Sequence, residues 1–316
     1  MSDNNTIKML GSAISRRGPL KRITDAVRLV DGAGDGLEGL VLEQYGRHFS
    51  AQVFDERWLA KKDLLTDFLK GSLGAEYFIV KDRTGSAASS PEDFKKQVWL
   101  KGGSSVTVVR ENGLNFSVDL DDTLNSGLFL DMRGNREIVS GSAKGRRVLN
   151  CFAYTCSFGV YCRARGALEL VNVDVSKKYL ERGRLNYRLN NLEPARNEMI
   201  RADVFEYLER APEKGNSFGL IILDPPSFSR YKGRAFSVKK DMPELVALAI
   251  KALEPGGDLF VSTNFSGMSS DGLLAMVEGA AGKRKIRRRD SLGQDMDFTA
   301  SGSIPRSCLA TLLVRL

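Results

Sequence analysis

Residues 220–230 have the sequence LIILDPPSFSR, an apolar run that ends in an acid, two prolines and a short segment with a phenylalanine. An apolar run of this length bounded by Asp-Pro is typical of a buried parallel strand that leads into a rigid loop. Ligands of open α/β sheets bind at the carboxyl ends of such strands. We therefore predict a site where a carboxylate and backbone carbonyls bind an amino group and an aromatic ring stacks on a flat ligand, formed by Asp224, Pro225, Pro226 and Phe228. The alternative is an ordinary strand exit with Asp224 as a turn residue.

The composition is that of a globular protein long enough for two domains. The chain has 316 residues, of which 42% are apolar and 27% are charged, so it can bury a full core. The first ten residues, MSDNNTIKML, contain no apolar signal core, and no apolar run approaches the length of a membrane span. We expect a cytoplasmic protein without a membrane partner, and its oligomeric state is left open.

The charge balance favours a polyanionic partner. Lys and Arg exceed Asp and Glu by 47 − 39 = 8, and the pI is about 9.3, which is compatible with binding nucleic acid. The basic residues form several clusters rather than one tail, at 16–17, 21–22, 144–147, 177–188 and 283–289. Solvated helix faces are the alternative explanation for any one of these clusters.

The cysteines and the histidine exclude two kinds of site. Cys151, Cys156, Cys162 and Cys308 form no C-x-x-C pair and have apolar neighbours, which is typical of reduced, buried thiols rather than disulfides or a metal cage. His48 is the single histidine and is predicted in a strand, which argues against Ser-His-Asp hydrolysis and His-dependent metal sites. No metal is expected.

The first hundred residues predict a small α+β domain without a catalytic constellation. Residues 1–20 are polar and predicted to be loosely ordered. Over residues 26–54, alternating apolar positions around glycine-rich turns predict a β-meander. The segment 56–73 has helical spacing and predicts a helix that ends at Gly71, and the apolar run at 76–83 predicts another strand. A Ser-rich connector follows at 84–96. We draw this domain as residues 1–100 and a second domain as residues 101–316.

The second domain predicts a mostly parallel sheet. It begins with a hairpin, residues 105–120, around Asn112-Gly113. Five short apolar strands alternate with helical segments, a pattern of βαβ units, and they are RRVLNCF, LELVNVDV, NEMIRADV, FGLIILDPP and GDLFVSTN. Two strand-like stretches near the C-terminus predict an antiparallel terminal hairpin. The fold class is therefore α/β, with a seven-stranded Rossmann-like sheet preceded by the small domain.

Polar side chains occur where each parallel strand ends. Asn150, Asp174, Asp203 and Asp224 terminate the first four strands, and the carboxyl ends of parallel strands share one edge of the sheet. Asp174 lies at the spacing of an acid that binds ribose hydroxyls; its alternative role is in the helix cap with Ser176. Asp203 is suited to accept from an adenine amino group while Val204 packs on the ring. These acids predict an adenosine-like ligand.

Several longer motifs resemble a known family. NSGLFLDMRGNR, LNCFAYTCSFG, NVDVSKKYLERGRLNYRLN, RADVFEYL, ILDPPSFSR, LEPGGDLFVSTN and SLGQDMDF are similar to class I S-adenosylmethionine-dependent methyltransferases. The likeness covers about the last two thirds of the chain and is greatest to bacterial 23S ribosomal RNA methyltransferases that make 5-methylcytosine or 7-methylguanine. DGLEGLVLEQYG resembles the small domain that precedes the catalytic domain in these enzymes. A counterpart of the family's RNA-binding PUA module is not expected, because the N-terminal segment is short.

The resemblance implies roles for individual residues. S-adenosylmethionine is the implied cofactor and RNA the implied partner. A loop at the first strand end would face the methionine part of the cofactor, made of Asn150, Cys151, Phe152, Ala153 and Tyr154. Residues at the second and third strand ends would hold the adenosine, namely Asp174, Val175, Ser176, Asp203 and Val204. Residues of the preceding segment would close the pocket, namely Phe129, Asp131 and Arg133. Residues 224–228 would lie between the cofactor methyl group and the target base.

The motif after the fifth strand favours guanine N7 as the target. Methylation of cytosine carbon 5 requires a thiolate that adds to the ring first, and the family members that do so are expected to carry that cysteine here. Residues 261–267, VSTNFSG, contain none. Guanine N7 has a lone pair and needs only alignment behind the methyl group. We therefore predict direct, non-covalent transfer to an unpaired or flipped base.

Other interpretations stay open at this point. The chain could make 5-methylcytosine, or bind a cofactor without transferring a methyl group, or act on a protein or small molecule. An NAD-linked dehydrogenase is disfavoured, because the first strand-to-helix turn lacks the glycine pattern of a pyrophosphate site. Candidate phosphate contacts are the basic segments 16–22 and 283–289, together with Arg230, Lys232 and Arg234.

Overall fold

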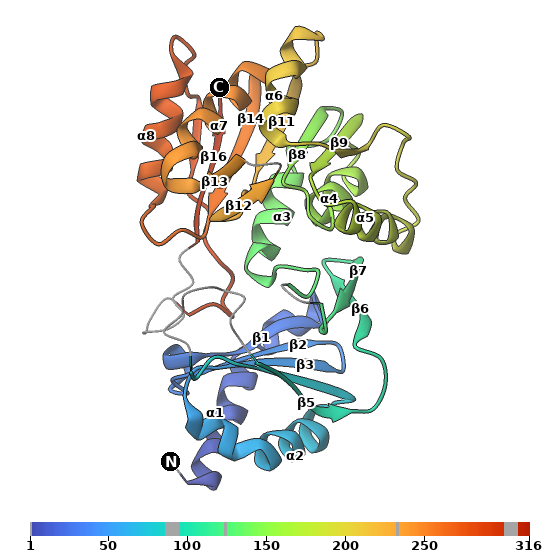
Figure 1. Cartoon of the computed structure of the whole chain (residues 1–316), viewed down its shortest axis with the longest axis vertical. Coiled ribbons are helices and arrows are strands. Elements are labelled where there is room, and N and C mark those ends of the chain that lie inside the picture. The colour runs from blue at the N-terminus through green and yellow to red at the C-terminus, as the bar shows by residue number, and fades with distance from the viewer. Residues whose placement is uncertain (1, 86–94, 123–124, 232–233, 300–308) are drawn as a thin grey trace. The chain divides into compact units, whose positions relative to one another are not determined.

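A computed structural model describes residues 2–85, 95–122, 125–231, 234–299 and 309–316, and the side chains at 229–235 are not described. The chain forms two compact units (Figure 1): residues 1–131 with 295–307, and residues 132–294 with 308–316. The predicted boundary at residue 100 differs from this division. No helix in the described ranges is long and apolar enough to cross a membrane.

The first unit contains a five-stranded sheet with the order β1-β2-β3-β4-β5. β3 and β4 are parallel and the other neighbours antiparallel. Helix α2 (Lys62–Leu73) makes the crossover between the two parallel strands, as a parallel connection requires. The strands are β1 (Ala26–Asp31), β2 (Leu40–Tyr45), β3 (His48–Val53), β4 (Tyr77–Asp82) and β5 (Lys95–Lys101). The predicted meander and the strand after it are thereby confirmed.

Two predictions about helices in this unit were wrong. Residues predicted to be loosely ordered form helix α1 (Asp3–Arg16), because Leu10, Ala13 and Ile14 make one apolar stripe that packs into the core of the unit. Helix α2 continues past Gly71 and ends before Gly74, whose φ of 63° closes the last turn.

The predicted hairpin is present but belongs to the first unit. Strands β6 (Val106–Glu111) and β7 (Leu114–Asp119) pair around Asn112 and Gly113, which have φ values of 49° and 82°, as a two-residue turn of this kind requires. The Asn112 amide donates to the carbonyl of Ile23 at 2.7 Å, and the Asp25 amide donates to that of Arg110 at 3.1 Å. These hydrogen bonds to the N-terminal segment are the reason that the unit extends beyond residue 100.

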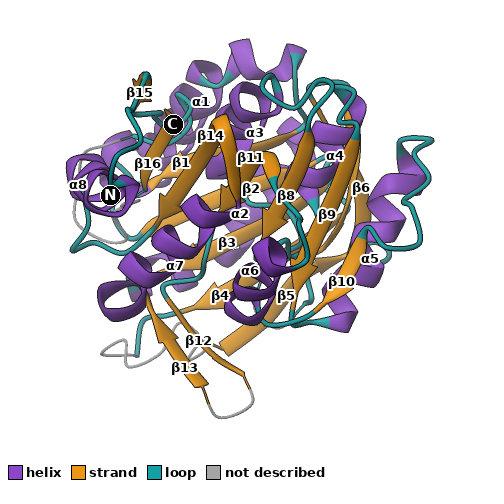
Figure 2. Ribbon diagram, turned by 90° about the horizontal axis from the view of Figure 1, so that it is seen from above, coloured by secondary structure: helices purple, strands orange, loops and turns teal. Residues whose placement is uncertain are grey.

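The second unit contains a seven-stranded sheet with the order β10-β9-β8-β11-β14-β16-β15 (Figure 2). The first five strands in this order are parallel, and β16 is antiparallel to both of its neighbours, β14 and β15. The strands are β8 (Arg147–Cys151), β9 (Glu169–Asp174), β10 (Met199–Arg201), β11 (Phe218–Leu223), β14 (Leu253–Thr263), β15 (Arg288–Asp290) and β16 (Ala310–Arg315). The five predicted parallel strands and the α/β class are confirmed.

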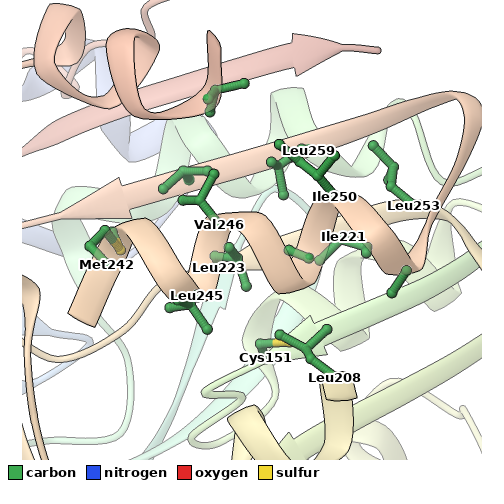
Figure 3. Close-up of a cluster of buried hydrophobic side chains, with 14 of the residues drawn as sticks. Cys151, Leu208, Ile221, Leu223, Met242, Leu245, Val246, Ile250, Leu253 and Leu259 are labelled. Carbon is green, nitrogen blue, oxygen red and sulfur yellow. The ribbon is translucent and has the colours of Figure 1, made fainter. Parts of the chain in front are cut away.

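Helices cover both faces of this sheet because alternate residues of each strand point to opposite sides. Ile221 and Leu223 pack with α6, α7 and α8, whereas Leu220 and Ile222 pack with α3 and α4. Figure 3 shows Met242, Val246 and Ile250 of α7 beside the strand residues of the first cluster. The helices are α3 (Arg133–Ser140), α4 (Ser157–Ala164), α5 (Lys177–Leu189), α6 (Val204–Glu213), α7 (Val238–Ala252) and α8 (Ser270–Ala281).

Candidate active site

The carboxyl ends of the central strands lie level with one another. Cys151 of β8 is in register with Val173 of β9 and with Leu223 of β11. Arg201 of β10 is in register with Asp174. The residues that follow these strands therefore start from one edge of the sheet, as predicted.

The loop after β8, residues 152–156, has an unusual backbone. Phe152, Tyr154 and Cys156 have φ values of 55°, 50° and 60°, the left-handed region that non-glycine residues rarely adopt. The loop is tied to the next strand, since the Ala153 amide donates to the Val173 carbonyl at 3.0 Å. Such conformations persist only where the surroundings impose them, and they cluster at ligand-binding sites.

Asp174 joins this loop to the start of α5. One carboxylate oxygen accepts the Tyr154 amide and the other accepts the Ser176 amide, both at 2.8 Å. Ser176 is the cap of α5, since its hydroxyl accepts the Tyr179 amide. Burial raises the pKa of Asp174 above its ordinary value, against these backbone hydrogen bonds. The amide of Val175 also contributes a backbone hydrogen bond. A carboxylate has about four acceptor sites, so Asp174 can still accept from a ligand hydroxyl.

Asn150 and Cys151 are buried where the strand ends. The Asn150 amide nitrogen donates to the Asn172 side-chain oxygen at 2.8 Å, and that of Asn172 donates to the Tyr187 hydroxyl at 3.0 Å. Cys151 is fully buried in the core, and burial raises the pKa of its thiol. A hydrogen bond to the neighbouring strand thus fixes the Asn150 side chain, and core packing fixes that of Cys151. Contact of the cofactor with these two residues, or with Phe152, Ala153 and Tyr154, stays a prediction.

Asp203 caps helix α6. Its Oδ1 accepts the amides of Phe205 at 2.9 Å and Glu206 at 3.2 Å, and its carboxylate is half-buried at the sheet edge. Val204 is only 2% exposed and packs in the core. Packing of Val204 against a ligand ring stays a prediction.

Ser262 of β14 holds Asp224. Its hydroxyl lies 2.6 Å from Asp224 Oδ1 and 3.2 Å from the Leu223 carbonyl, and because a hydroxyl has one proton we assign the donation to the closer carboxylate. Ser227 donates to the side-chain oxygen of Asn264. Sequence reasoning missed Ser262 and Asn264, although both lie in the VSTN motif at the end of the fifth parallel strand.

The residues after Asp224 continue into a small hairpin that the sequence did not predict. β12 (Phe228–Tyr231) and β13 (Arg234–Ser237) pair antiparallel. Phe228 is 55% exposed, Pro226 is exposed and Pro225 is buried. The Phe236 ring lies 5.9 Å from those of Phe152 and Phe205, so the hairpin packs against the 152–156 loop and α6. The alternating pattern FSRY…RAFS is the sequence signal that could have indicated it.

Some predicted site residues do not lie at these strand ends. Phe129 and Asp131 belong to the first unit, and Arg133 begins α3 in the second. Burial would lower the pKa of Arg28, but the nearby carboxylates of Glu43, Asp31 and Asp131 raise it above its ordinary value. Lys232 lies outside the described residues. A role in closing a ligand pocket stays a prediction for Phe129, Asp131 and Arg133.

The donors and acceptors fit an adenosine ligand. Carboxylates suit ribose hydroxyls and an exocyclic amine, which are hydrogen-bond donors. Asp174, Asp203 and Asp224 supply such acceptors at the strand ends of one sheet, and each is half-buried. Phe228, four residues after Asp224, adds an exposed aromatic face.

Comparison with known families decides what this site belongs to. Residues 91–312 match the model of the S-adenosylmethionine-dependent methyltransferase family. The chain belongs to this family. It is 33% identical over 276 residues to ribosomal RNA large subunit methyltransferase I of Aeromonas salmonicida, covering 86% of this chain and 69% of the relative. It is 35% identical to ribosomal RNA large subunit methyltransferase K of Neisseria meningitidis serogroup B, covering 73% and 67%.

Solved structures agree with the family. The crystal structure of SMU.776 complexed with SAH matches this methyltransferase with a TM-score of 0.88 at 26% identity, over 100% of this chain and 82% of that one. A SAM-dependent methyltransferase from Agrobacterium tumefaciens shares the fold, with a TM-score of 0.67 at 19% identity, covering 93% and 90%. The protein is an S-adenosylmethionine-dependent enzyme, as the sequence indicated.

Proposed function

We propose that this methyltransferase modifies a base of 23S ribosomal RNA, and that the acceptor is guanine N7. The observation that carries the proposal is the family match together with two relatives named as large subunit ribosomal RNA methyltransferases. The net charge of +8 supports a polyanionic substrate. Such a substrate would place the protein in the cytoplasm.

The state of the thiols supports direct transfer. Cys151, Cys156 and Cys162 are buried and not disulfide-bonded, and burial raises the pKa of each, for Cys162 to about 12. A thiol of this kind is protonated and cannot add to a pyrimidine ring. Cys308 lies outside the described residues. Guanine N7 needs no nucleophilic catalyst, so alignment of the base is enough.

The chain's own residues would act by binding and orientation. S-adenosylmethionine supplies an electrophilic methyl group. We assign the ribose to Asp174, the adenine amine to Asp203, and the methionine end to the loop that includes Phe152 and Tyr154. Asp224, fixed by Ser262 at 2.6 Å, would orient the target base, on which Phe228 would stack. We also propose that the seven-stranded sheet of the second unit is the Rossmann-like sheet of the methyltransferase.

RNA would bind through basic surface segments as well as through the target base. A base within a duplex is out of reach, so the substrate nucleotide is unpaired or flipped. Candidate phosphate contacts are residues 16–22 and 283–289, and the first unit is a candidate RNA-binding domain. Contacts of this kind release counterions, so RNA affinity should fall steeply with salt. An affinity that does not change with salt would count against these segments.

Nucleoside mass spectrometry of ribosomal RNA tests the proposal. We expect RNA from a strain without this gene to lose one 7-methylguanosine, and expect plasmid-borne wild type, but not Asp224→Ala, to restore it. Loss of a 5-methylcytidine instead would show that the acceptor is cytosine carbon 5 and would refute the non-covalent mechanism. An unchanged RNA profile would direct the search to protein or small-molecule substrates.

A further inference from the structure

The buried face of helix α5 contacts the unusual 152–156 loop directly. Asn186 is fully buried, and its amide nitrogen donates to the Thr155 carbonyl at 2.9 Å. Thr155 is the residue between two left-handed positions, Tyr154 and Cys156. One helix side chain thus holds the middle of the strained segment.

Gly183, one turn before Asn186, lies where the same loop comes close to the helix. A Cβ atom at this position would lie 2.5 Å from Cys156 Sγ, 3.1 Å from Cys156 Cβ and 3.4 Å from the Thr155 carbonyl. Glycine is unfavourable inside a helix, so its presence here is explained by the close approach of the loop. Any larger residue would push Cys156 away.

Together with Asp174, these residues hold three successive loop residues. Asp174 accepts the Tyr154 amide at 2.8 Å, Asn186 donates to Thr155, and Gly183 receives the Cys156 side chain. Left-handed conformations of non-glycine residues are unstable by themselves and need such restraint. The loop shape therefore depends on contacts from α5 as well as on its own sequence.

We propose that Asn186 and Gly183 are positioning residues for the cofactor: they hold the 152–156 loop in the shape that binds S-adenosylmethionine. The proposal rests on the assignment of this loop to the methionine end of the cofactor. Neither residue reaches the ligand in this role, so both act through the loop backbone. Their replacement should weaken cofactor binding more than it weakens the fold.

Two measurements on the full-length protein test this. Isothermal titration with S-adenosylhomocysteine gives the affinity, and hydrogen exchange of the cofactor-free protein gives the protection of the Ala153, Tyr154 and Cys156 amides. We expect Asn186→Ala to raise the Kd at least about tenfold, a change equivalent to about 1.4 kcal/mol, and to speed the exchange of these amides. Gly183→Ala should act in the same direction, and it keeps the test available if Asn186→Ala does not fold.

Asn190→Ala is the matched control. Asn190 is the residue that directly follows α5, and its amide nitrogen donates to the Asn186 backbone carbonyl at 2.7 Å, a contact with the end of the helix. We expect the wild-type Kd from this variant. Leu208→Ala, on the buried face of α6, shows how far general destabilisation alone changes the Kd.

Wild-type affinity and amide protection in Asn186→Ala and Gly183→Ala would overturn the proposal. The proposal would also fail if these variants lost no more affinity than Leu208→Ala loses for an equal fall in Tm. A wild-type protein that binds S-adenosylhomocysteine but methylates no RNA would refute the proposed substrate alone and leave the positioning role in place.

Discussion

Ser262 donates a hydrogen bond of 2.6 Å to Asp224, so the end of strand β14 holds the carboxylate at the end of β11. The two strands are parallel neighbours, with Leu223 in register with Val261. Ser262 is fully buried, and a hydrogen bond to a carboxylate from a buried donor is stronger than one between neutral groups. The orientation of the Asp224 carboxylate is therefore set by the sheet rather than by the loop alone.

Replacing Ser262 should slow methyl transfer without weakening cofactor binding. A hydrogen bond to a charged group contributes about 1.5–3 kcal/mol, so Ser262→Ala is expected to reduce kcat at least about tenfold. The Kd for S-adenosylhomocysteine should not change, because Ser262 contacts Asp224 and not the ribose site. Steady-state kinetics and isothermal titration measure the two quantities. Ser217→Ala, just before the start of β11, is the control, and an equal effect from it would refute the role.

Asp174 should make cofactor binding sensitive to mild acid. Burial raises the pKa of this carboxyl, and only the ionised form accepts fully from ribose hydroxyls. As pH falls, Asp174 becomes protonated at a higher pH than an ordinary aspartate, and affinity should fall in that range. Titrations with S-adenosylhomocysteine from about pH 4 to about pH 8, a range that spans the ordinary aspartate pKa and neutrality, test this. Asp174→Asn should bind weakly at every pH, and a pH profile like that of wild type in this variant would assign the titration to another group.

Asp258 should stabilise the second unit. Its side chain is fully buried and pairs with Arg315 at 2.7 Å and Arg146 at 2.8 Å. Burial alone would raise the pKa of Asp258, but the hydrogen bond and charge of Arg315 hold it below the ordinary value. Since the folded pKa is depressed, this stability is present above the unfolded pKa and is lost as pH falls through the folded pKa.

Asp258→Ala should lower the free energy of unfolding by about 3 kcal/mol at neutral pH, because it removes the shared partner of two arginines. Urea denaturation measures the loss. The comparison is Glu169→Ala, which breaks the exposed pair with Arg147 and should cost about 1 kcal/mol or less. Equal losses in the two variants would show that the buried carboxylate has no special role.

The cysteines should take no covalent part in catalysis. Cys151 and Cys156 are fully buried with raised thiol pKa values. RNA that contains 5-fluorocytidine is expected to form no adduct that survives denaturing electrophoresis. Cys151→Ala should keep kcat within about threefold, although the cavity it creates lowers Tm. A stable adduct with wild type, absent in one cysteine variant, would identify that thiol as a nucleophile.

The sequence predicted those parts of the fold that follow from local patterns. Short apolar runs indicate the five parallel strands. Asp174 and Asp224 are recognisable in the sequence itself because each comes at the end of such a run. Helix α1 was missed because its apolar stripe of Leu10, Ala13 and Ile14 is short and lies among polar residues. The extent of the first unit depends on hydrogen bonds between residues 23–25 and 110–112, a long-range pairing that no local pattern reveals.

The parts of the site that sequence reasoning missed depend on contacts across strands. Ser262 is recognisable only when β14 is known to lie beside β11. Asn150 has the position of a ligand residue because it lies near the end of a strand, but its partner Asn172 lies on the neighbouring strand. The role of Gly183 is likewise visible only from the atoms of Cys156 that pack against it.

The sharpest test is a crystal structure of this methyltransferase with S-adenosylhomocysteine. We predict ribose hydroxyls within hydrogen-bond distance of Asp174, the adenine amine at Asp203, and the sulfur facing the segment from Asp224 to Phe228. A nucleoside bound anywhere other than at these strand ends, or a 152–156 loop without contact to it, would contradict the assignment.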